Sequence, residues 1–208
     1  METLKVMSPY DGDCIGELNL VGAAEIETML STAYRLFSDR SCWLPKSHRL
    51  SILRKAAELI RERREPLALQ AASEGGKPLV DSLVEIDRAA DGIECCVEEI
   101  RTSAGNVIPM QIDANSSSKV AFTQYEPIGV VAAVSAFNHP FNLIVHQVAP
   151  AVATGCPVLV KPAASTPLSC YTFLEILREA GLPEGWAQMV LPEKTELATE
   201  MVSDPRVS

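Results

Sequence analysis

The sequence predicts an α/β fold in which a helical N-terminal half leads into a parallel sheet built from βαβ units. Two observations carry this prediction. Apolar residues recur at helical spacing through much of residues 23–100, whereas residues 129–202 alternate short apolar runs with helical segments. Strands that alternate with helices run parallel and are joined by right-handed crossovers. The 208 residues, of which 47% are hydrophobic, can form a sizeable core.

Composition argues against several classes of protein. The net charge is −9 at pH 7, so the basic face of a nucleic-acid-binding protein is not expected. No apolar run in the sequence approaches the roughly 20 residues of a membrane span, and the N-terminus lacks the pattern of a signal peptide. Six scattered cysteines without a Cys-x-x-Cys pair indicate reduced thiols, and we therefore expect a cytoplasmic protein.

The N-terminal half is expected to be mostly helical. One or two short strands are expected within residues 1–22, around 15–20. They are followed by helices over 23–37, from near Ser47 past Ile60, over 67–73 and over 79–100. Gly75-Gly76-Lys77-Pro78 predicts the end of the third of these helices. Residues 102–118 predict an exposed loop because they are rich in Gly, Pro, Asn and Ser, and residues 119–125 alternate like a half-exposed strand.

The C-terminal half begins with a continuous apolar run over 129–136, which predicts a buried strand. The elements expected after it are a helix over 141–154, a strand over 158–161, a helix over 167–180, a strand over 187–191 and a helix over 195–202. This order is the start of a nucleotide-binding βαβ unit, in which ligands bind beyond the carboxyl ends of the strands.

The turn after the first buried strand, Phe137-Asn138-His139-Pro140, is polar and contains no glycine. It therefore lacks both the Gly-x-Gly-x-x-Gly fingerprint and the P-loop motif, whose backbones cradle phosphates. The side-chain amide of Asn138 has two donors that could stabilise an oxyanion. Asn138 could instead cap a helix that begins near Pro140, and the spacing leaves both interpretations open.

Lys161 ends the second buried strand and precedes Pro162. It could contact ribose hydroxyls or a phosphate, or it could be a solvated lysine at a strand end. His139 and His146 have no third ligand near them in the sequence, so no metal site is expected. Cys156 has no neighbouring base, which favours a small buried residue over a nucleophile.

Five segments, taken in order, resemble the aldehyde dehydrogenase superfamily, and the resemblance covers nearly all of the chain. They are Glu74-Gly-Gly-Lys-Pro78, Glu126-Pro-Ile-Gly-Val130, Phe137-Asn-His-Pro140, Ala149-Pro-Ala-Val-Ala-Thr-Gly155 and Val160-Lys-Pro-Ala163. The resemblance implies a Rossmann-like cofactor-binding domain and oxidation of an aldehyde to a carboxylic acid with NAD or NADP. In such enzymes a cysteine thiolate attacks the aldehyde, hydride leaves to the nicotinamide, and a glutamate-activated water hydrolyses the thioester.

The resemblance also implies roles for individual residues. Asn138 matches the amide of the oxyanion hole, and Lys161 matches the lysine that contacts the adenosine ribose. The residues at cofactor-binding positions are Val134, Ser135, Ala136, Phe137, Asn138, Lys161, Ala163 and Ala164. Position 164 is often a glutamate that grips both ribose hydroxyls, so Ala164 removes a barrier to the 2′-phosphate of NADP without excluding NAD. His139, with Asn142 to His146 after it, resembles a branch that handles small polar aldehydes.

Relative to that family, the chain is expected to be truncated. Residues 1–117 would form the N-terminal arm and helices of the cofactor-binding domain, 118–128 an oligomerisation strand, and 129–208 the first part of the Rossmann-like NAD(P)-binding domain. The catalytic domain, with its glutamate base and nucleophilic cysteine, would lie outside these residues, so this piece alone is expected to be inactive. The implied partners are a small-molecule aldehyde and copies of the same chain in a homodimer or homotetramer. A truncated, non-catalytic module for nucleotide binding or oligomerisation is the alternative.

Overall fold

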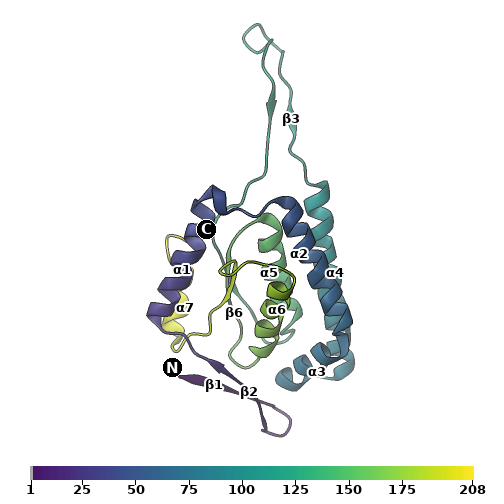
Figure 1. The fold of residues 1–208 in the computed structure, drawn as a ribbon, viewed down its shortest axis with the longest axis vertical. Coiled ribbons are helices and arrows are strands. Elements are labelled where there is room, and N and C mark those ends of the chain that lie inside the picture. Colours follow the sequence, from purple (N-terminus) through teal and green to yellow (C-terminus); the bar gives the residue numbers. More distant parts are fainter. Residues whose placement is uncertain (1) are drawn as a thin grey trace.

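The structure is a computed structural model that describes residues 2–208 (Figure 1). The strands are β1 (Thr3–Met7), β2 (Cys14–Asn19), β3 (Val107–Ile108), β4 (Ala121–Phe122), β5 (Val131–Val134), β6 (Val158–Lys161) and β7 (Ala187–Met189). The helices are α1 (Ala23–Ser38), α2 (Lys46–Glu62), α3 (Arg64–Gly75), α4 (Leu79–Thr102), α5 (Asn142–Thr154), α6 (Leu168–Glu179) and α7 (Thr195–Val202), with a short 3-10 helix η1 (Arg40–Cys42) before α2. The predicted α/β fold class is confirmed.

A parallel sheet with the strand order β5-β6-β7 forms the centre of the molecule. The chain steps from β5 to β6 to β7, and an isolated parallel bridge then places Val207 beside Val130, at the start of β5. The direction in which successive strands are added therefore reverses at β5. Ligands of open α/β sheets bind at the carboxyl ends of the strands where this reversal occurs.

Helices cover both faces of this sheet. Val158 and Val160 of β6 belong to the larger core, which contains buried residues of α2 to α6. Leu159, between them, belongs to a smaller core with α1 and α7. This alternation follows from the two-residue period of a strand, and Figure 1 shows α1 and α7 together on one side of β6.

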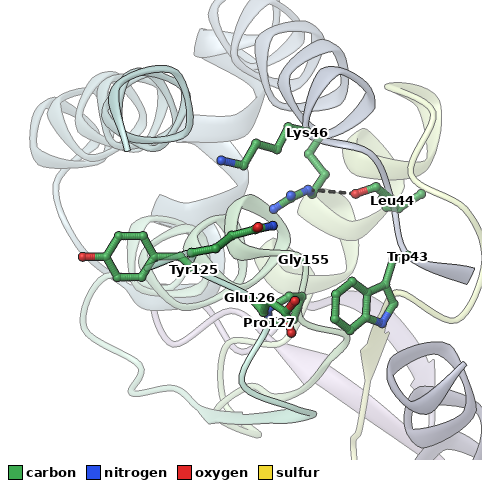
Figure 2. A pocket seen from close by; sticks show the side chains of 9 residues that line it. Trp43, Leu44, Lys46, Tyr125, Glu126, Pro127 and Gly155 are labelled. Carbon is green, nitrogen blue, oxygen red and sulfur yellow. Dashed lines mark hydrogen bonds between the residues drawn. The ribbon is translucent and has the colours of Figure 1, made fainter. Parts of the chain in front are cut away.

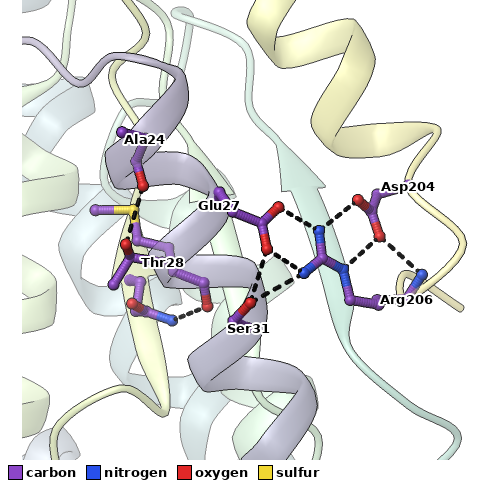
Figure 3. Close-up of polar contacts among 8 residues, drawn as sticks. Ala24, Glu27, Thr28, Ser31, Asp204 and Arg206 are labelled. Carbon is purple, nitrogen blue, oxygen red and sulfur yellow. Dashed lines mark hydrogen bonds and ion pairs between the residues drawn. The ribbon is translucent and has the colours of Figure 1, made fainter.

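A charged cluster ties the chain after α7 to α1 (Figure 3). The Arg206 guanidinium donates to both carboxylate oxygens of Glu27 at 2.7 Å, and it also donates to Asp204 at 2.7 Å. These hydrogen bonds from Arg206 lower the pKa of Glu27 and of Asp204 to about 2. The cluster therefore holds both acids ionised well below neutral pH.

An arm formed by residues 103–127 projects from the body between α4 and β5 (Figure 1). The predicted strand over 119–125 is too long, because β4 contains Ala121 and Phe122, which pair with Ile108 and Val107. The arm's apolar side chains are exposed, Val107 by 79% and Phe122 by 69%. A two-stranded ribbon that does not pack against a core is only marginally stable, so its strands pair over only a short stretch.

The other predicted elements lie within a few residues of their observed bounds. Gly76, with a φ of 64°, ends α3 in the left-handed conformation that the Gly-Gly-Lys-Pro segment predicts. Helix α3 begins at Arg64, earlier than expected, because Pro66 is tolerated in the first turn of a helix. No helix within residues 2–208 is both long and apolar enough to span a membrane.

Candidate active site

The carboxyl ends of β5 and β6 bring two of the predicted segments to one edge of the sheet. Val134 is the register partner of Lys161, and the Ser135 N–H donates to the Lys161 carbonyl at 3.0 Å. Residues 134–138 and 161–164 therefore leave the sheet from adjacent strands. This edge is also the place where the strand order reverses.

Exposed apolar and polar side chains share this edge. Val134, the last residue of β5, is 52% exposed, and Phe137, three residues further on, is 63% exposed. Asn138 and Ala164 are also exposed, whereas Ser135 is buried. The Lys161 ammonium, which is half-buried, donates to the Pro162 carbonyl at 3.3 Å. The edge thus offers an apolar surface flanked by one amide and one cation, which suits a ligand with both rings and hydroxyls.

Asn138 does not cap the helix that follows it. Helix α5 begins at Asn142, later than Pro140, and its N-cap residue Phe141 makes no side-chain capping hydrogen bond. Its first N–H groups are satisfied by Glu85 of α4, whose Oε1 accepts from the Phe141 N–H at 2.8 Å and the Asn142 N–H at 2.9 Å. The capping interpretation of Asn138 is therefore wrong, and capping does not occupy its amide.

The Glu85 carboxylate has cationic and polar neighbours of its own. Its side chain is completely buried, and its Oε2 forms an ion pair with Lys77. The Nδ1 of His139 lies 3.6 Å from the same oxygen and 3.3 Å from the Lys77 ammonium. Lys77 therefore compensates the buried charge of Glu85 directly beneath the Asn138 turn.

A second buried carboxylate caps the neighbouring helix. The two oxygens of Glu74 accept from the Leu168 N–H at 2.8 Å and the Ser169 N–H at 2.9 Å, at the start of α6. Burial raises the pKa of Glu74, while these hydrogen bonds act in the opposite direction. The N-termini of α5 and α6 are both occupied by protein carboxylates. A diphosphate binds such helix ends in many dinucleotide-binding folds, but the first N–H groups of these two helices already donate to carboxylates.

Comparison with known proteins agrees with this geometry. The model of the aldehyde dehydrogenase family matches residues 1–208. The chain belongs to the aldehyde dehydrogenase family.

Similar members of the family are considerably longer than this chain. The 3-sulfolactaldehyde dehydrogenase of Priestia aryabhattai is 30% identical over 100% of this chain and 43% of that protein. The mitochondrial succinate-semialdehyde dehydrogenase of Arabidopsis thaliana is 31% identical over 99% of this chain and 38% of its own length. The crystal structure of NADP-dependent glyceraldehyde-3-phosphate dehydrogenase from Bacillus halodurans C-125, complexed with NADP, has a TM-score of 0.90 and 30% identity, covering 100% of this chain and 44% of that one. The chain spans about two fifths of the length of these relatives.

No described cysteine of this aldehyde dehydrogenase chain lies in the loops that leave β5 and β6 at this edge. Cys156 and Cys170 are buried, and burial raises the pKa of the Cys170 thiol. The interpretation of Cys156 as a small buried residue is confirmed. Among the described residues, no group of three or more His, Cys, Asp or Glu side chains is placed to hold a metal ion.

A side chain also caps the opposite end of α5, which borders the pocket shown in Figure 2. The Arg49 guanidinium donates to the carbonyl of Ala153 in the last turn of α5, and its Nε donates to the Leu44 carbonyl at 3.0 Å. Burial lowers the pKa of Arg49. The small pocket around Arg49, lined by Trp43 and Pro127 among others, therefore lies at the end of α5 remote from Asn138.

Sequence reasoning did not identify Lys77 and Glu85 as residues that support the Asn138 turn, nor Glu74 as the cap of α6. A signal for the two acids was present, because each lies on the apolar stripe of its helix. Glu85 is in a buried series with Ser82, Ile86 and Ala89, and Glu74 follows Leu67 and Ala71 at helical spacing. A carboxylate on such a stripe requires a partner.

Proposed function

We propose that the complete protein is an NAD(P)-dependent aldehyde dehydrogenase that oxidises a small acidic aldehyde to a carboxylic acid. The observation that carries this proposal is the exposed Asn138 amide at the strand-order reversal, with Glu85 taking over the capping of α5. Membership of the aldehyde dehydrogenase family supports oxidoreductase chemistry in general.

The carboxyl edge of β5 and β6 fits a nicotinamide dinucleotide. In this proposal Lys161 contacts a ribose, and Val134, Ser135, Ala136, Phe137, Ala163 and Ala164 line the cofactor. The exposed apolar surface of Val134 and Phe137 supports this assignment, because a bound ring would cover it. The exposed Ala164 leaves room for a 2′-phosphate, which supports NADP as well as NAD.

Asn138 would act when the aldehyde oxygen becomes negatively charged. In the proposed reaction a cysteine thiolate outside these 208 residues adds to the aldehyde carbon, and the carbonyl electron pair moves to oxygen. The Asn138 amide donates a hydrogen bond to that oxygen and stabilises the charge. The cofactor, when bound, supplies the acceptor for the hydride, and hydrolysis of the cysteine thioester releases the acid.

The polar residue beside Asn138 supports a small acidic aldehyde. His139, whose side chain is 43% exposed, follows Asn138 and lies beside Lys77. Both residues can donate hydrogen bonds, which a carboxylate, sulfonate or phosphate group accepts. The three relatives described above are each named for an aldehyde that carries such a group.

The exposed arm supports assembly with further copies of the chain. We propose a homodimer or homotetramer in which 118–128 contributes an intermolecular strand. The exposed Phe122 and Val107 on a ribbon with unpaired edges support this arrangement. The six free cysteines support a reducing, cytoplasmic location.

The test is oxidation of matched aldehydes by the complete protein. NAD(P)H formation is followed at 340 nm with succinate semialdehyde, glyceraldehyde 3-phosphate and the uncharged control butanal. We expect kcat/KM to be at least about tenfold higher for one of the acidic aldehydes than for butanal, a difference of ~1.4 kcal/mol. Equal or higher activity with butanal contradicts the substrate class, and inactivity with every aldehyde and both cofactors contradicts the enzyme assignment.

A further inference from the structure

We infer that Glu85 is a positioning residue for Asn138: through α5 it holds the polar turn against α4 and so orients the oxyanion-stabilising amide. The catalytic part of this inference rests on the proposed function. Its structural part, that Glu85 fixes the turn, does not.

The contacts of Glu85 surround the residues just after Asn138. Its Oε1 accepts from the N–H groups of Phe141 and Asn142 at 2.8 and 2.9 Å, and its Oε2 lies 3.6 Å from the Nδ1 of His139. One carboxylate thus touches positions one, three and four residues beyond Asn138. The Leu143 N–H donates to the His139 carbonyl at 3.0 Å, so a single hydrogen-bonded turn joins the residue after Asn138 to the start of α5.

Two features hold the carboxylate itself in place, and a third holds the turn. It is completely buried on the apolar stripe of α4, which packs against α5. Lys77 pairs with it from the segment that ends α3, where Gly76 adopts a left-handed conformation. A Cβ added at Gly75 would lie 4.0 Å from the Pro140 ring, so the turn also packs on this segment. A carboxylate held in this way cannot swing to a second position without exposing an unpaired charge to the core.

This rigidity bears on how Asn138 would work. An oxyanion donor is effective when it already points at the position of the developing charge, because no reorganisation is then needed during the reaction. The exposed Asn138 side chain cannot be oriented by burial. Its orientation therefore depends on the backbone of residues 139–142, which Glu85 holds.

Glu74 provides a matched control within the same chain. It is also a buried carboxylate of the helical layer that caps a helix of the sheet domain, but it caps α6 at Leu168 and Ser169. A general requirement for buried capping groups would affect Glu74 and Glu85 variants alike. A positioning role predicts that the Glu85 variant alone disturbs residues 139–142 and acylation.

The experiment compares Glu85→Leu, Glu85→Gln and Glu74→Leu in the complete protein. Amide hydrogen exchange at 139–142 and 166–169 is measured alongside the thermal midpoint, the NAD(P)H burst rate and KM. For Glu85→Leu we expect exchange at 141 and 142 to rise at least about tenfold through local opening. We expect the burst rate to fall roughly 10- to 100-fold with KM changed less than about threefold, as for a misplaced catalytic group.

The two remaining variants complete the test. Glu85→Gln keeps an acceptor oxygen and should restore most of the protection and at least part of the burst rate. Glu74→Leu should raise exchange at 168 and 169 and leave the burst rate within about twofold. If Glu85→Leu does not fold, Lys77→Met, which removes the counter-charge of Glu85, takes its place and is compared with Glu74→Gln by the same measurements.

The possible outcomes distinguish a positioning role of Glu85 from a purely structural one. Unchanged exchange at 141 and 142 in Glu85→Leu, or in Lys77→Met where that variant replaces it, overturns the inference. Burst rates that fall equally in Glu74 and Glu85 variants, in proportion to their thermal midpoints, overturn the positioning role in favour of a purely structural one. If the wild-type protein oxidises no aldehyde, the proposed function fails, whereas the exchange data still decide whether Glu85 fixes the turn.

Discussion

Val134 and Lys161 lie opposite each other as the last register pair of the parallel strands β5 and β6. The loops after these residues carry Asn138 and Ala164. Because both loops leave the same edge, one extended ligand could contact both. Substitutions in the two loops should therefore have separable effects, on chemistry in the first and on cofactor choice in the second.

Replacing Asn138 with alanine should slow acylation. The variant loses one donor to the oxyanion, which is expected to reduce the burst rate by roughly 10²–10³-fold. Rapid-mixing measurement of NAD(P)H formation checks this, with the thermal midpoint as a test of folding. Asn115→Ala, on the exposed arm, serves as the control and should leave the rate unchanged. A normal burst rate in Asn138→Ala would remove Asn138 from the active site.

Replacing Ala164 with glutamate should select against NADP. A carboxylate near the proposed ribose position repels a 2′-phosphate and accepts hydrogen bonds from ribose hydroxyls. We expect the Kd for NADP to rise at least about tenfold, or ~1.4 kcal/mol, with no weakening of NAD binding. Fluorescence titration measures both constants, and Ala164→Gln controls for side-chain size. Equal effects of Glu and Gln would show that charge at position 164 does not govern the choice.

The cluster around Arg206 should make the stability of the fold decline more steeply as the pH falls. Arg206 holds the pKa of Glu27 and Asp204 at about 2, below the ordinary values of 4.5 and 3.8. Between these values the unfolded chain binds more protons than the folded one, so stability falls as the pH falls from about 4.5 towards 2. In Arg206→Met the pKa values of both acids should lie nearer their ordinary values. The stability should then fall less steeply between about pH 4.5 and 2.

Thermal midpoints measured between pH 2 and 6 check this prediction. Arg54→Met, which replaces an exposed arginine of α2, is the matched control and should retain the wild-type slope. Identical slopes in wild type and Arg206→Met would mean that the ion pairs of Figure 3 do not persist in solution.

Introducing a lysine at Phe122 should weaken the proposed assembly. The Phe122 side chain is 69% exposed on the arm, so the substitution should cost the single chain little. Charge at an interface core is unfavourable, and light scattering after size exclusion should show a smaller average mass at equal concentration. Tyr10→Lys, at a 93% exposed aromatic residue outside the arm, should leave the mass unchanged. An unaltered mass in Phe122→Lys would exclude this residue from the interface.

The sequence predicts best where short-range signals agree. Strand β6 and helix α7 have the predicted bounds, because an apolar run precedes Pro162 in the first case and helical spacing begins at Thr195 in the second. The predicted length of the strand over 119–125 was too great. Its alternation is a local pattern, whereas its actual pairing depends on β3, which lies outside the core. The choice between cap and catalytic amide at Asn138 required a contact between Glu85 and Phe141, which are 56 positions apart. No local pattern contains that information.

Helix α5 is capped at its N-terminus by an acid from α4, Glu85, and at its C-terminus by a base from α2, Arg49. Its macrodipole is therefore compensated from within the protein at both ends. This has a consequence for redesign. Grafting a glycine-rich loop onto residues 135–140 would not by itself turn this βα unit into a phosphate-binding one, because Glu85 would still occupy the helix terminus and repel the phosphate. Such a redesign would have to begin on α4, in the layer behind the site.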